Sequence, residues 1–144
     1  ERAHRLYPYN YLLCIWAGEQ AYYSRGETKS PEGRDRRLTA AEYWANQGLA
    51  LNPYKSSLRL LKARLLNRRS PRAAAEYWAE YVEWHFWEPY NHAVLAEFLA
   101  DAEEFDNALD ELRWVKGSAH YRHAREAVMS AWRKAMQPPP LPPG

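Results

Sequence analysis

The hexapeptide Ala40-Ala41-Glu42-Tyr43-Trp44-Ala45 occurs a second time, unchanged, as Ala74-Ala75-Glu76-Tyr77-Trp78-Ala79. The second copy starts 34 residues after the first, and six identical residues at one spacing are hard to obtain by chance. Self-similarity at a period of about 20 to 50 residues is typical of repeat proteins. The hexapeptide therefore predicts a fold built from repeated units.

The segments around the two copies have a helical pattern. Apolar residues recur at helical spacing, as in Leu58, Leu61 and Leu65, and a proline precedes several of these segments, which is a helix start signal. The pattern predicts an all-α chain with helices at 10–25, 37–51, 55–68, 72–87, 91–102, 105–116 and 119–136. Between the first two helices, Gly26, Pro31 and Gly33 predict a surface loop insertion over 26–37.

The predicted helices form three pairs and one further helix. Because a single helix pair cannot bury its apolar face, about three units must stack before the array is stable, and the last helix caps the stack. We expect one domain over residues 1–137, followed by the Pro-rich tail 138–144. That tail is typical of polyproline II, and it is either a ligand for proline-recognising modules or a linker.

Charge is segregated along the chain although the net charge is only +2. Residues 55–72 hold seven basic and no acidic residues, and residues 73–112 hold eleven acidic residues and no Lys or Arg. The basic run is either a solvated helix face that pairs with the acidic run or part of a recognition surface. The small net charge argues against general nucleic-acid binding, so no nucleic-acid partner is expected.

The sequence predicts no enzyme active site, metal site or cofactor site. Cys14, the only cysteine, lies in an apolar run and is expected to be inert core. His120, His123 and Glu126 are three residues apart and would share a helix face, but no further protein ligand stands at a recognisable spacing. No stretch approaches the roughly 18 apolar residues of a membrane span, so a soluble domain without direct membrane insertion is expected.

The chain resembles the tetratricopeptide repeat (TPR) family. The third unit carries the family's apolar and small positions at Leu95, Ala96, Leu99, Phe105, Ala108, Leu112 and Val115. The resemblance implies a right-handed stack of helix pairs whose first helices line a concave groove. It also implies a scaffold function, the binding of a partner peptide or protein in that groove. The groove residues implied by the alignment are Trp16, Gln20, Tyr23, Arg59, Lys62, Tyr90 and Glu97.

Two other functions remain open from the sequence. The chain has Pro-Tyr-Asn tripeptides just before helical segments, as in Pro89-Tyr90-Asn91, and many Trp and Tyr residues. In these features it resembles the repeat region of bacterial O-antigen ligase or polymerase-type proteins. That resemblance implies a periplasmic accessory domain whose partner is the membrane part of the same polypeptide; otherwise the compartment stays open and includes the cytoplasm. The third hypothesis is glycan or nucleic-acid binding through the aromatic and basic strips.

Overall fold

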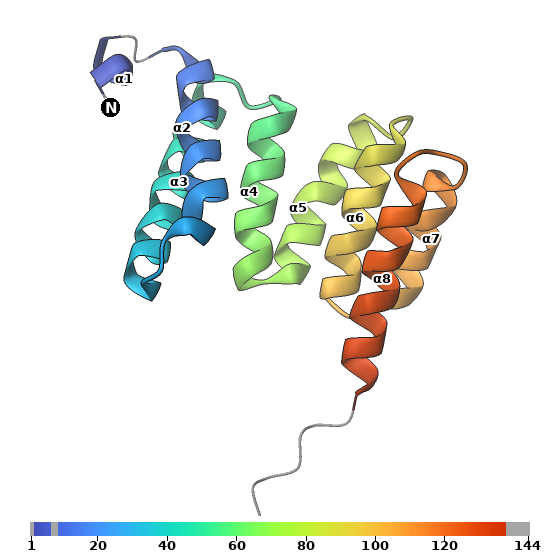
Figure 1. Cartoon of the computed structure of the whole chain (residues 1–144). Helices are drawn as coiled ribbons and strands as arrows, with labels where there is room; N and C mark the ends of the chain where they lie inside the picture. The colour runs from blue at the N-terminus through green and yellow to red at the C-terminus, as the bar shows by residue number, and fades with distance from the viewer. Residues whose placement is uncertain (1, 7–8, 138–144) are drawn as a thin grey trace, which may run out of the picture. The chain divides into compact units, whose positions relative to one another are not determined.

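The chain folds into helices that form two compact units. A computed structural model describes residues 2–6 and 9–137, and those residues form no β-strand (Figure 1). The all-α prediction is confirmed. The units are Glu1–Leu66 and Asn67–Gly144, so each is described by itself, whereas the sequence predicted one domain over 1–137. The Pro-rich tail, 138–144, lies outside the described residues.

Unit 1 contains three long helices around small residues. Its elements are α1 (Arg2–Leu6), α2 (Tyr11–Tyr23), the 3-10 turn η1 (Ser24–Glu27), α3 (Pro31–Leu51) and most of α4 (Ser56–Arg69). One cluster of its core consists of Tyr22, Ala41, Ala45, Leu61 and Leu65.

Gly48 allows the helices of unit 1 to approach closely. A Cβ atom at this position would lie 2.6 Å from Leu58 Cδ1 and 3.0 Å from Cys14 Cβ. Real Cβ atoms avoid contacts below about 3 Å, so any larger residue would force the Leu58 side chain to move or the helices to separate. The glycine therefore fixes where the three helices pack together.

The predicted loop insertion over 26–37 is wrong, because α3 begins at Pro31. Ser30 caps this helix: its hydroxyl oxygen accepts a hydrogen bond from the Gly33 backbone N–H at 3.0 Å, and proline is favoured at the first helical position. Gly33 is buried, and a Cβ there would lie 2.2 Å from Thr28 Cγ2. The glycine thus serves close packing at a helix start and does not mark a loop.

Unit 2 contains the other four helices. They are α5 (Pro71–Trp84), α6 (Pro89–Asp101), α7 (Phe105–Val115) and α8 (Tyr121–Met136). Helices α6, α7 and α8 enclose a core made of Ala93, Ala96, Ala100, Ala108, Leu112, Val115, Ala124 and Val128. Because most of these side chains are small, the three helices pack at short range.

Both copies of the hexapeptide lie inside helices, the first in α3 and the second in α5. The alanines Ala41 and Ala75 are buried in both copies. The tryptophans differ, since Trp44 is half-buried and Trp78 is only 1% exposed. Identical residues at corresponding positions therefore have similar, but not identical, roles in packing.

Candidate binding surfaces

Three residues predicted for the partner-binding groove form one surface on α2. Trp16 and Tyr23 are 67% and 63% exposed, and Gln20 between them is also exposed. Positions 16, 20 and 23 follow the i, i+4, i+7 pattern of one helix face. The three side chains line an open hollow of about 310 Å³, which we call the α2 hollow; Glu19, Ser24 and Glu27 complete its lining.

The two basic residues predicted for the groove are less accessible in the structure than the prediction requires. Arg59 is only 7% exposed, and its Nη1 donates a hydrogen bond to the Pro53 carbonyl oxygen at 3.1 Å. The expected accessible anchor at Arg59 is therefore wrong, because this side chain is directed to the connection between α3 and α4, which it stabilises. Lys62 is half-buried.

The two predicted groove residues of unit 2 contact histidines at the start of α8. The ring centroids of Tyr90 and His120 are 5.2 Å apart, and Glu97 Oε1 lies 3.6 Å from His123 Nε2. Each histidine thus contacts a different residue of α6. Within the described ranges, no group of three His, Cys, Asp or Glu side chains is arranged to hold a metal ion.

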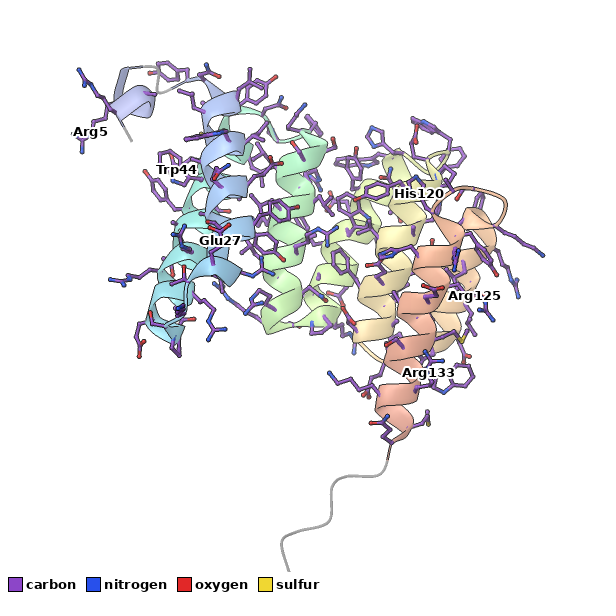
Figure 2. The ribbon with its side chains drawn as sticks, viewed as in Figure 1. Arg5, Glu27, Trp44, His120, Arg125 and Arg133 are labelled. Atoms are coloured by element: carbon purple, nitrogen blue, oxygen red, sulfur yellow. The ribbon has the colours of Figure 1, made fainter. Side chains whose placement is uncertain are left out.

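Sequence reasoning missed a cluster of exposed aromatic side chains on unit 2. The connections α5–α6 and α7–α8 lie at the same end of this unit, where Figure 2 labels His120. Four large aromatic residues from the ends of α5 and α7 and from the α5–α6 connection are 42% to 61% exposed, and we call them the aromatic end: Trp84, Phe86, Trp87 and Trp114. The available signal was the run Trp84-His85-Phe86-Trp87 just before Pro89.

A buried histidine holds the aromatic end in place. His92 is 4% exposed; its Nδ1 lies 2.6 Å from Glu111 Oε2, and its Nε2 lies 2.6 Å from the Phe86 carbonyl oxygen. Its ring also stacks on Trp114, with centroids 5.0 Å apart and planes 8° from parallel. His92 therefore connects α6 to α7 and to the α5–α6 connection, and it supports the Trp114 ring directly.

Cys14 lies in the interior of unit 1 and is 0% exposed, as the sequence predicted. Burial raises the pKa of the Cys14 thiol, and a backbone hydrogen bond opposes this shift in part. A raised pKa disfavours the thiolate, which is the reactive form. The thiol therefore has the environment of a packing group.

Comparisons with protein-family models, with curated proteins and with solved structures find no match for this chain. The resemblances to the TPR family and to O-antigen ligase or polymerase-type proteins therefore rest on the sequence pattern. None of the described helices combines the length and apolar character that crossing a membrane requires.

Proposed function

We propose that this chain is a TPR-like scaffold that binds a peptide segment of a partner protein at the α2 hollow. The observation that carries the proposal is the combination of Trp16, Gln20 and Tyr23 around one concave surface on a single helix face. Ligand sites are concave, and they combine aromatic area with a few polar groups that fix orientation. Exposed Trp and Tyr are the residue types that dominate interface energies.

Further support for a TPR-like stack comes from the repeat and from the core of unit 2. The two hexapeptide copies lie within helices, and the positions at which the third unit resembles the family are core or packed against it. Leu95, Ala96, Ala108, Leu112 and Val115 are each at most 5% exposed. A stack of this kind presents its helices as a rigid surface, which lowers the entropy cost of binding.

The chemistry of the α2 hollow favours a peptide that is both basic and apolar. Glu19 and Glu27 are the charged groups in its lining, so a Lys or Arg side chain in the bound segment would have a carboxylate partner. Trp16 and Tyr23 would contact the apolar residues and the aliphatic stems of long basic side chains.

The double substitution Trp16→Ala, Tyr23→Ala is expected to weaken peptide binding by about 30-fold or more, since loss of a binding hot spot costs about 2 kcal/mol or more. Peptides would be selected on the full chain from a displayed library of random twelve-residue sequences, and their affinities measured by fluorescence polarisation. Tyr43→Ala is the matched control, because Tyr43 is 52% exposed on α3, outside the hollow. Unchanged affinity in the folded double variant would refute this site.

A second candidate function, glycan binding, is favoured by the aromatic end of unit 2. Its exposed rings, of which Trp114 stacks on His92, offer flat faces of the kind on which sugar rings stack. Trp87→Ala is expected to abolish retention of any oligosaccharide that the full chain binds on a glycan array, whereas Trp16→Ala should not. Binding that survives a change from 50 to 500 mM salt would support a neutral glycan, because binding driven by phosphate contacts weakens steeply with salt. An array with no retained glycan would reject this candidate.

A further inference from the structure

Two adjoining hollows follow the outer side of α7 and α8. The first, of about 320 Å³, lies along α8 and is lined by Arg125, Glu126, Met129, Trp132, Arg133 and Met136. The second, of about 220 Å³, lies between the two helices and is lined by Leu109, Leu112, Arg113, Lys116, Tyr121, Arg125 and Met129. Because both hollows include Arg125 and Met129, they form one continuous surface, which we call the α7–α8 groove.

The floor of the groove is apolar: its α7 part includes the core residue Leu112, and its α8 part lies beside the core. On α8, Met129 is half-buried, Trp132 is 40% exposed and Met136 is 67% exposed, and their spacing of three and seven residues places them on one helix face. The core face of the same helix is formed by Ala124 and Val128, which are 0% exposed. Helix α8 therefore has one apolar face for the core and a second one that lines the groove.

The rim of the groove is basic. Arg113, Lys116, Arg125 and Arg133 contribute cations, and Figure 2 shows Arg125 and Arg133 along α8. Lys116, Arg125 and Arg133 form no ion pair with any other residue that the structure describes.

The acidic groups near the rim leave this positive charge largely unbalanced. Arg113 approaches Asp110 at 3.6 Å, but both side chains are more than half exposed, so the pair is weak. Glu126 is the acidic residue among those lining the two hollows, and it lies 3.4 Å from Arg122. The groove therefore retains an excess of positive charge.

We propose that the α7–α8 groove binds an acidic amphipathic helix of a partner protein. A helix in a groove inserts apolar residues spaced i, i+3, i+4 and i+7, and methionine side chains adapt to the shapes of such residues. Glu and Asp residues that flank this apolar stripe would meet the cations on the rim. The predicted ligand has the opposite charge to the one that the α2 hollow favours, so the two surfaces would take different segments.

The shape of the surface favours a peptide helix over an anionic lipid bilayer. A bilayer is contacted by side chains that protrude, whereas these apolar groups line hollows between the basic residues. An acidic helix, by contrast, would fill the hollows and neutralise the rim at the same time.

The test uses the full chain and a labelled synthetic peptide of 18 residues, with Leu at i, i+3, i+4 and i+7 and Glu on the flanks. Fluorescence polarisation is expected to show at least tenfold tighter binding than for the same peptide with Lys in place of Glu. The double substitution Arg125→Glu, Arg133→Glu should weaken binding by about tenfold or more. Arg72→Glu is the matched control, because Arg72 is 77% exposed on α5 and lines neither hollow.

Three outcomes would overturn the proposal. The first is equal binding of the Glu and Lys peptides. The second is unchanged binding of the Glu peptide by the double variant with its helical circular dichroism intact. The third is binding of vesicles containing phosphatidylglycerol without binding of the Glu peptide, which would identify a lipid surface. Trp132→Ala supplies a separate check of the apolar floor, and it should weaken peptide binding without reversing the preference for Glu over Lys.

Discussion

Replacement of Trp78 by Ala is expected to lower the free energy of unfolding of unit 2 by about 3–5 kcal/mol, the usual cost of deleting a buried aromatic side chain. Trp78 is 1% exposed and is among the largest fully buried side chains of the chain. Its ring centroid lies 4.8 Å from that of Tyr81. The alanine would leave a cavity, because the surrounding helices can collapse only in part.

A hydrogen bond adds to the cost at Trp78. Its indole Nε1–H donates to the Asn91 carbonyl oxygen at 2.9 Å, and the Asn91 side chain in turn donates to the His85 carbonyl oxygen at 3.2 Å. These bonds connect α5 to the start of α6. Trp78→Phe keeps most of the ring and loses the donor, so it should cost less than Trp78→Ala, although it leaves the Asn91 carbonyl oxygen without the indole donor.

The measurement is urea-induced unfolding followed by circular dichroism. If the dependence of the free energy of unfolding on urea concentration is unchanged, the decrease in the midpoint urea concentration gives the loss of stability. Trp87→Ala is the control, because Trp87 is 61% exposed and its loss should change stability by well under 1 kcal/mol. Equal effects of Trp78→Ala and Trp87→Ala would show that Trp78 does not have the packing described.

Helix periodicity predicted the secondary structure well because it depends on local spacing. The main error was at residues 31–37. Their Gly and Pro content predicted a loop, but they form the first two turns of α3. Ser30 followed by Pro31 is a helix start signal of the same kind that was used correctly at Pro89. Gly33 was misleading because its role is a close contact with Thr28, which depends on how the chain folds back.

A candidate surface was predictable from the sequence only where all its residues lie on one face of a single helix. Trp16, Gln20 and Tyr23 share a face of α2, so helical spacing alone brings them together. The burial of Arg59 depends on the position of the Pro53 carbonyl group, and the aromatic end depends on contacts between α6 and α7. Contacts of that kind arise from tertiary packing, and neither the repeat nor the spacing of residues along a helix predicts them.

His92→Ala is expected to lower the free energy of unfolding of unit 2 by about 3 kcal/mol, because buried hydrogen bonds that involve charged groups contribute about 1.5–3 kcal/mol each. Both ring nitrogens of His92 lie 2.6 Å from oxygen atoms, so the substitution removes these polar contacts and the stack on Trp114. The α5–α6 connection would lose its attachment through Phe86. Urea unfolding of the variant gives the stability, and amide hydrogen exchange of residues 85–88 gives the local effect.

A double-mutant cycle separates the two partners of His92. Glu111→Gln keeps an oxygen acceptor for Nδ1 and removes the negative charge, so it is expected to cost less than His92→Ala. If His92 acts through Glu111, the double variant should cost less than the sum of the two single variants. Additive effects would mean that the contact at 2.6 Å contributes little, and that His92 stabilises unit 2 through Phe86 and Trp114 alone. Because the Trp114 ring stacks on His92 and the Phe86 carbonyl oxygen contacts its Nε2, any glycan binding by the aromatic end is expected to weaken in His92→Ala even where the helices remain folded.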